Sequence, residues 1–229
     1  MSLATYRRIA AVPRLVRGLS ALVVTAGIAS PAAAADDRIE LWLNPSISAE
    51  LDERHGIELE TGQRFRADPA DDTYFARLWI SRSLGRGTTL SAGIERRHEG
   101  RSRETRLLQQ IGYPLIGPLK GRTRVEQRFV EGTGRTGVRV TQRIGVAAPL
   151  RKSAPDDWSA VAYVEGFLTL RPTTGGGDRG VTGVRTFLGV EREFRRVDVT
   201  IGYLRQQSIR RNGPDTVGHA PLIGLTYKI

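Results

Sequence analysis

Residues 122–146 read RTRVEQRFVEGTGRTGVRVTQRIGV, and this stretch decides the fold. Apolar and polar side chains alternate on both sides of a central glycine-rich segment, EGTGRT, at 131–136. A period of two places successive side chains on opposite faces of an extended strand. The glycine-rich segment has the composition of a turn, so the stretch predicts a β-hairpin. One face of this hairpin is apolar, and the other carries arginine and glutamate together.

The same alternating unit recurs along the rest of the chain, and no segment has a convincing helical period. Pro45 interrupts the first unit, which predicts an edge strand or a bent strand there. We count eleven segments: 38–51, 57–66, 74–81, 88–95, 104–113, 122–130, 137–146, 158–170, 184–191, 197–204 and 219–229.

The connections between these segments alternate in length, as they do in outer-membrane barrels, where short periplasmic turns face longer outer loops. The short connections are 52–56, 85–87 and 194–196, and the longer ones are 67–73 and 171–180. A charged loop is expected at 98–103, while 114–121 and 149–157 are long for periplasmic turns.

These patterns predict an all-β fold, an antiparallel up-and-down transmembrane β-barrel of ten to twelve strands. Eleven segments conflict with the even strand number of single-chain bacterial barrels, so either one strand is missed or 38–51 does not span fully. The alternative is a soluble, lipocalin-like periplasmic lipid carrier with its apolar face inward. Aromatic girdles distinguish the two. Tyrosines near strand ends favour the membrane, whereas Trp79 and Phe167 lie on the charged face and do not.

Residues 1–35 predict a cleaved signal peptide, which leaves 36–229 as the barrel. This segment has four arginines and no acid, an apolar run from Leu19 to Ile28, and small residues at 32–35. Such a charged region, apolar region and A-x-A site are typical of export, and the run is shorter than the roughly 20 residues of a transmembrane helix. We therefore expect an outer-membrane location, with the periplasm as the alternative.

The net charge and the cysteine content limit the classes of partner that the chain can be expected to bind. The chain carries a net charge of +11, of which the signal segment supplies +4, so the remainder is +7. Nucleic acid is the usual first partner of a basic chain, but an exported chain rarely meets it, and no nucleic-acid binding is expected. Cysteine is absent, which excludes disulfides and thiolate metal sites. We expect contacts with outer-membrane lipids and lipopolysaccharide.

The C-terminal strand predicts a further partner. Ile223, Leu225, Tyr227 and Ile229 form an alternating apolar series that ends at the last residue. Outer-membrane proteins end in such a strand, usually with Phe last, and the barrel-assembly machinery reads it. An ordinary final strand of a soluble sheet remains the alternative.

The charged face predicts a lumen network. A narrow barrel leaves little interior beyond its side chains, so interleaved opposite charges are expected to pair and plug it. The alternative is a narrow, weakly anion-selective channel, favoured by the excess of arginine. The predicted network is Glu104, Arg106, Arg122, Arg124, Glu126, Arg128, Arg139, Arg143, Glu165 and Arg185.

No catalytic activity is expected from the sequence. The candidates for an outer-membrane hydrolase or acyltransferase, the alternative reading, are His98 and His219 with Asp71 and Asp72, near the predicted outer end. No nucleophile lies in a recognisable motif, and His55 falls in a short turn. Three scattered histidines lack the spacing of metal ligands, so neither a metal nor another cofactor is expected.

Several short motifs together resemble a known family. They are ETRLLQQ at 104–110, RTRVEQRF at 122–129, YVE at 163–165 and GYLRQ at 202–206. In this order they are similar to the family catalogued as domain of unknown function 2490, over about Leu41 to Tyr227. The resemblance implies an exported outer-membrane β-barrel and contributes no activity.

Overall fold

The computed structural model of the protein describes residues 36–151, 158–211 and 213–229, so the expected signal segment lies outside the described residues. In the described part of the chain, no helix is long and apolar enough to cross a membrane. In chain order the elements are β1 (Asp36–Ile39), β2 (Leu41–Glu50), β3 (His55–Phe65), the short 3-10 helix η4 (Pro69–Asp71), β4 (Thr73–Gly85), β5 (Thr88–Glu99), β6 (Ser102–Pro114), β7 (Leu119–Val130), β8 (Thr136–Pro149), β9 (Ser159–Arg171), β10 (Gly180–Phe194), β11 (Val197–Ser208) and β12 (Thr216–Lys228).

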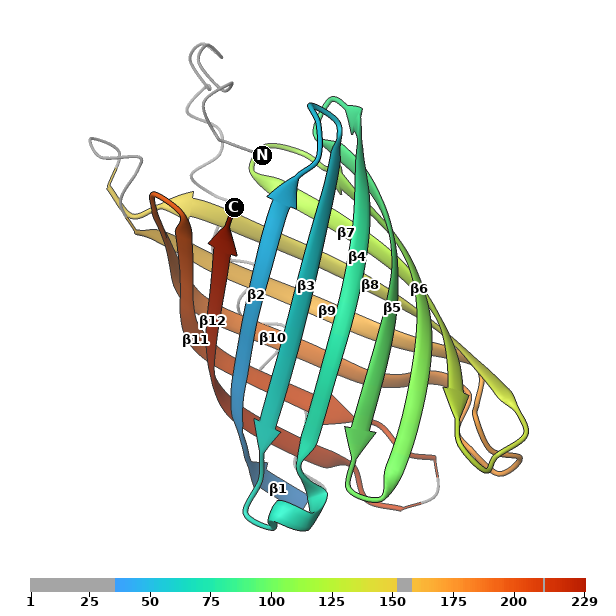
Figure 1. Cartoon of the computed structure of the whole chain (residues 1–229). Helices are drawn as coiled ribbons and strands as arrows, with labels where there is room; N and C mark the ends of the chain where they lie inside the picture. The colour runs from blue at the N-terminus through green and yellow to red at the C-terminus, as the bar shows by residue number, and fades with distance from the viewer. Residues whose placement is uncertain (1–35, 152–157, 212) are drawn as a thin grey trace. The chain divides into compact units, whose positions relative to one another are not determined.

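The strands form one closed barrel (Figure 1). From β2 to β12 each strand pairs in antiparallel fashion with the next, and β12 then pairs with β2 in parallel. The short β1 also pairs in parallel with β12, and the backbone N–H of Glu40 donates to His219 O at 2.9 Å. Strands β1 and β2 therefore follow one another along the same edge of β12. The wall of the barrel consists of eleven strands, β2 to β12, which are called its staves below. The predicted all-β barrel is confirmed.

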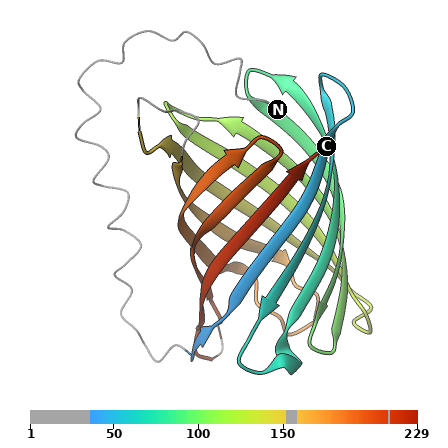
Figure 2. The same cartoon turned by 60° about the vertical axis from the view of Figure 1, so that its left-hand side comes forward.

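The parallel seam between β12 and β2 explains the odd number (Figure 2). In an up-and-down meander of eleven staves, the first and last run in the same direction, so they can close only in parallel. The expectation of an even number, and the idea that a strand was missed, are therefore wrong. An odd number also places β1 and Ile229 at opposite ends of the barrel (Figure 1).

Pro45 lies inside β2 rather than ending it. It pairs with Leu225 in the parallel ladder, but the antiparallel ladder to β3 passes from Leu43 directly to Ser46. Proline has no N–H to donate to a ladder, so the predicted irregularity is present as a local gap in the β2–β3 pairing.

The apolar face of each strand points outward and the charged face inward. In β4, Thr73, Phe75, Arg77 and Trp79 are buried and alternate with four exposed residues. A lipocalin-like carrier would need the opposite arrangement. Every stave from β2 to β12 exposes at least one large apolar side chain: Ile47, Leu59, Leu78, Ile94, Leu107, Phe129, Ile144, Leu168, Leu188, Ile201 and Leu225.

Two predicted connections are shorter in the structure. Strand β5 continues to Glu99 and β6 starts at Ser102, so the expected loop at 98–103 is a tight turn around Gly100, whose φ is 56°. The connection expected at 114–121 shrinks to 115–118, because Leu119 already belongs to β7. At the ends of β5 and β6 charged residues continue the ladder because their side chains reach solvent there, so charge alone did not mark the loop at 98–103.

The connections separate into two sets at the two barrel ends. One end carries the connections β2–β3, β4–β5, β6–β7, β8–β9 and β10–β11, and the other carries the connections β3–β4, β5–β6, β7–β8, β9–β10 and β11–β12. The second end, where β3 finishes and β4 begins, is called the long-loop end below.

Disulfide trapping would test the parallel seam. Ser46 Oγ donates to Thr226 Oγ1 at 2.9 Å across it, and adjacent strands lie close enough for a disulfide. We expect the double variant Ser46→Cys, Thr226→Cys to form an intramolecular bond on oxidation, seen as a shift on a non-reducing gel. The chain has no cysteine of its own to interfere.

A matched control pairs Ser46→Cys with Thr200→Cys, because Thr200 lies on β11, one strand beyond β12. Trapping of this pair instead, or failure of the first pair in folded protein, would contradict the eleven-stave closure.

Candidate functional site

A single buried carboxylate gathers three guanidinium groups inside the barrel. Glu95 on β5 has no exposed surface. It forms ion pairs with Arg77 on β4, with Arg97 at 2.9 Å on its own strand, and with Arg106 at 3.3 Å on β6. These four residues are called the Glu95 cluster. Buried charges are tolerated only when they are paired and hydrogen-bonded, so these strands depend on one another through Glu95.

Two further carboxylates extend the Glu95 cluster to neighbouring strands. Arg77 reaches Glu60 on β3 at 2.7 Å, and Arg106 reaches Glu104 at 2.5 Å on its own strand. Glu104 also binds Arg128 on β7 at 2.5 Å. The ion pairs thus run without interruption from β3 to β7.

A second carboxylate organises the strands from β7 to β10. Glu165 on β9 pairs with Arg122 on β7, and with Arg143 on β8 and Arg185 on β10, both at 3.2 Å. These residues are called the Glu165 cluster. The guanidinium of Arg143 also lies 3.7 Å above the ring of Tyr163, so an aromatic face holds part of the positive charge.

Arg139 and Arg124 show two different ways of holding an interior guanidinium. Arg139 on β8 pairs with Glu126 on β7 at 2.7 Å. Arg124 instead donates to the amide oxygen of Gln110, at 2.7 and 2.9 Å, and lies 5.0 Å from the ring of Trp79. Because Trp79 is on β4 and Arg124 on β7, this contact reaches across the interior.

The ten residues that the sequence placed in a lumen network all lie on the inward face. Nine take part in the ion pairs above, and Arg124 binds an amide instead. Glu95, Arg77 and Arg97 are not among the ten residues that the sequence predicts for the lumen network. Arg97 was missed because the predicted strand ended at residue 95, although the alternation continues through Arg97 with the same parity.

Aromatic rings fill the interior beside the charges. Trp79 and Phe167, whose inward position argued against a membrane barrel, are buried and lie against guanidinium groups. Their bulk requires small neighbours: a Cβ built on Gly93 would lie 2.5 Å from the Trp79 ring, and one on Gly62 would lie 2.1 Å from Phe75. Glycine in these strands therefore makes room for a ring on the next strand.

An apolar core that the sequence analysis did not predict lies near the seam. It consists of Trp42, Phe187, Leu204, Ala220 and Leu222, all buried, with Val161 and Tyr163 packed against it. These residues lie on the inward face of β2, β10, β11 and β12, and among these strands only β10 contributes an arginine, Arg185, to the predicted lumen network.

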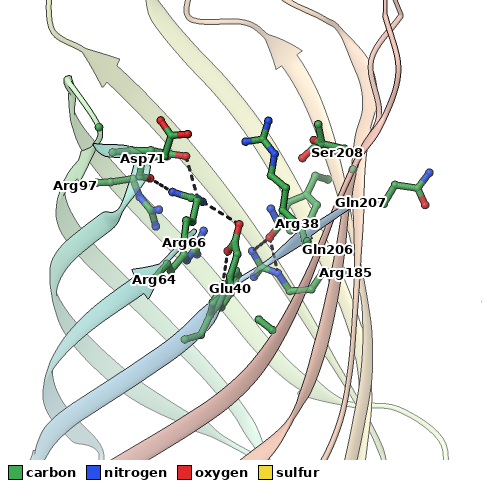
Figure 3. Close-up of a pocket in the computed structure, with 18 of the residues that line it drawn as sticks. Arg38, Glu40, Arg64, Arg66, Asp71, Arg97, Arg185, Gln206, Gln207 and Ser208 are labelled. Atoms are coloured by element: carbon green, nitrogen blue, oxygen red, sulfur yellow. Dashed lines mark hydrogen bonds and ion pairs between the residues drawn. The ribbon is translucent and has the colours of Figure 1, made fainter. Parts of the chain in front are cut away.

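A cavity of about 680 Å³ opens inside the long-loop end (Figure 3). It is called the arginine chamber. Its acidic lining residues are Glu40, Asp71 and Glu99, and its arginines are Arg38, Arg64, Arg66, Arg97, Arg101, Arg106, Arg128, Arg139, Arg185 and Arg210.

The guanidinium of Arg64 lies 3.7 Å from the centroid of the Trp42 ring, and its Nε is buried without a hydrogen-bond partner among the described residues. The Nε of Arg106 also lacks a partner, but Glu95 and Glu104 hold the rest of that guanidinium in ion pairs. The nearby Arg66 is held by Glu40 at 2.9 Å. An unsatisfied buried donor is unfavourable, so Arg64 is a position where an incoming acceptor would be stabilised.

The residues considered for catalysis do not assemble. His55 binds Asp52 at 2.8 Å in the 51–54 turn, at the end opposite the chamber, and the Arg54 N–H and the His55 ring lower the pKa of Asp52 to about 2. His219 stacks on Tyr203, while His98 is exposed at the end of β5.

The candidate acids serve the loop structure. Asp72 accepts the backbone N–H of Arg66 at 2.8 Å and the hydroxyl of Tyr74 at 3.2 Å. The backbone carbonyl of Asp71 accepts a hydrogen bond from the Arg66 side chain. Over the ranges that the structure describes, no group of three or more His, Cys, Asp or Glu residues could hold a metal ion.

Comparison with known proteins supports the family and adds no chemistry. A family model described as "Protein of unknown function (DUF2490)" matches residues 39–217, which confirms the resemblance drawn from the sequence motifs. An uncharacterized protein of Methylorubrum extorquens is 37% identical over 112 residues, which cover 45% of this chain and 47% of that protein. The match thus spans about half the length of that relative. No solved structure matches the chain.

Removal of the Glu95 charge should strongly destabilise the barrel. Glu95→Gln leaves three guanidinium groups buried together, and breaking a buried ion pair costs about 3–5 kcal/mol. We expect a lower midpoint of urea unfolding for the refolded protein, followed by tryptophan fluorescence. The control is Glu131→Gln, which removes an exposed pair with Arg96 and should cost at most about 1 kcal/mol. Equal stability of the two variants would contradict a structural role for the Glu95 cluster.

Proposed function

Since the chain belongs to a family of proteins of unknown function (DUF2490), we propose a function from the geometry of its barrel. The protein is an outer-membrane β-barrel with a structural role, and its interior charges close the lumen. The observation that carries the proposal is the difference between the two faces: large apolar side chains point outward on every stave, and ion pairs and a small apolar core occupy the inside.

The outward face supports a lipid environment. Contiguous exposed apolar surface of this extent is unusual for a soluble monomer, and a closed barrel leaves no unpaired strand edge in lipid. Exposed tyrosines at strand ends, such as Tyr74 and Tyr227, suit the membrane interfaces. Tyr203, which the sequence placed near a strand end, lies in the middle of β11 because this strand continues to Ser208. On this proposal the partners are outer-membrane lipids and lipopolysaccharide, and the barrel-assembly machinery reads the exposed series Ile223, Leu225 and Tyr227 of β12.

The interior supports a closed lumen. The Glu95 cluster ties together β4, β5 and β6, and the Glu165 cluster ties together β7 to β10. The apolar core occupies the side formed by β2, β10, β11 and β12. A continuous water path would have to displace the arginines of these clusters, and in each cluster a single carboxylate holds three guanidinium groups.

A narrow, weakly anion-selective channel is the second candidate, and the arginine chamber favours it. Ten arginines against three acids would attract anions to the long-loop end. The periplasmic carrier is less favoured, because a lipid cargo requires an apolar interior. We propose no catalytic role, since the candidate His and Asp residues either form the hydrogen bonds of turns and loops or are exposed at strand ends.

Planar-bilayer recording separates the two candidates. For purified, refolded protein we expect silence or rare, small openings, because side chains fill the lumen. A large, steady pore would contradict the closed lumen. Small openings whose reversal potential shifts toward chloride in a potassium chloride gradient, and lose this preference near 1 M salt where the Debye length is about 3 Å, would establish the channel instead.

Substitution of one outward residue tests the membrane location. Ile94 lies near the middle of β5 and is flanked by the exposed Leu78 and Leu107. Ile94→Arg should reduce the folding free energy in phospholipid vesicles by about 2–4 kcal/mol if the residue faces the bilayer midplane.

The control is Ile94→Val, which keeps an apolar, β-branched side chain and should fold nearly as well as the wild type. An arginine variant that folds into vesicles as stably as the valine variant would contradict the proposed orientation. Retention of the native protein in the outer-membrane fraction, with heat-modifiable migration on a gel, provides an independent check.

A further inference from the structure

We propose that the arginine chamber is a binding site for a small anion that carries a phosphate group, with Arg64 as its central contact. Neither the family nor the relative assigns any ligand to this chain. The inference goes beyond the proposed function, because it depends on the geometry of the chamber and not on membrane location or on a closed lumen.

The lining of the chamber contains more arginines than acids. Ten arginines line it with three acids. Among the described residues, the carboxylates Glu95, Glu104, Glu126 and Glu165, which lie outside the lining, form ion pairs with five of these arginines. An excess of arginine in a recess attracts anions, so the chamber favours an incoming anion.

Arg64 lies in the chamber with its guanidinium already oriented by a ring. Its guanidinium stacks on Trp42 and is not in an ion pair among the residues that the structure describes, while its Nε lacks a partner. Stacking fixes the plane of a guanidinium and leaves the N–H groups at its edge for an acceptor. Arg64 is thus already oriented and desolvated, which lowers the cost of binding.

Two further arginines, Arg185 and Arg97, line the same chamber as Arg64. Arg185 also lies over Trp42, with 5.1 Å from its guanidinium carbon to the ring centroid. Arg97 enters the same chamber from β5 (Figure 3). Three staves, β3, β5 and β10, thus supply arginines to one space. Phosphate oxygens accept bidentate hydrogen bonds from such forks more readily than from lysine.

Size and lining indicate the class of ligand. A volume of about 680 Å³ is typical of small-molecule sites and larger than a phosphate ion requires. Gln206 and Ser208 offer neutral hydrogen-bonding groups, while Phe167 and Leu204 provide an apolar wall. The chamber therefore suits an organic phosphate, either a small soluble molecule or a phosphorylated lipid headgroup that enters from the long-loop rim.

Calorimetric titration of the refolded full barrel with inorganic pyrophosphate tests the site. In zwitterionic detergent at constant ionic strength, we expect saturable binding to the wild type. Arg64→Gln should weaken it about tenfold or more, the equivalent of one lost charge-assisted hydrogen bond. Arg64→Lys, which keeps the charge without the fork, should give an intermediate affinity.

The matched control is Arg124→Gln. Arg124 is also an interior arginine that stacks on a tryptophan and lacks an ion pair among the described residues, but it does not line the chamber. Its substitution should leave pyrophosphate affinity unchanged, and heat-modifiable migration verifies that each variant is folded. Absence of binding to the folded wild type, or an equal loss in Arg64→Gln and Arg124→Gln, would overturn the proposal.

A lipid arm identifies the source of the phosphate. The same titration is repeated in lipid discs of phosphatidylcholine with and without phosphatidic acid. If phosphatidic acid competes with pyrophosphate in the wild type, the site is one for a lipid headgroup. Unchanged pyrophosphate binding in both discs assigns it to a soluble phosphate. Binding that is lost in the phosphatidylcholine discs themselves would contradict a site inside the barrel.

Discussion

The parallel hydrogen bonds between β12 and β2 are the constraint on which the rest of the structure depends. Eleven antiparallel staves leave a first and a last strand that run in the same direction, each with an unpaired edge. Parallel ladders are slightly weaker than antiparallel ones, but an open edge is a greater liability. Once the seam is closed, each strand has an inner and an outer face. The period of two in the sequence then assigns alternate side chains to the interior and to the outer surface.

Closure forces the charged face into the confined interior of the barrel. A carboxylate there cannot remain alone, and Glu95 and Glu165 each collect three arginines from neighbouring strands. Aromatic faces hold guanidinium groups as well, as Trp42 holds Arg64. Glycines such as Gly93 make room for interior rings. The interior is therefore packed by alternating large and small groups, and guanidinium groups hold the carboxylates Glu95 and Glu165.

The kind of side chain that fills the interior differs along and around the barrel. The proposals for function depend on these differences. The apolar core lies beside the seam, and the ion clusters lie on the remaining staves. The arginine chamber lies inside the long-loop end, where its lining holds ten arginines and three acids. A barrel can thus be closed to transport and still present a basic recess at one end. The two proposals made for this protein are compatible for that reason.

The sequence by itself determined the strands, their two faces and the count of eleven segments, because these follow from a local period of two. It indicated the family through an ordered set of short motifs. It placed ten charged residues on the inner face, yet it ended β5 before Arg97, since charged residues at strand ends resemble a loop. Only the tertiary structure decided the direction of the seam, because closure joins residues about 180 positions apart. It also decided which arginines meet which carboxylate: Arg122 reaches Glu165 across β8, a contact set by barrel curvature and side-chain reach, which no local pattern encodes.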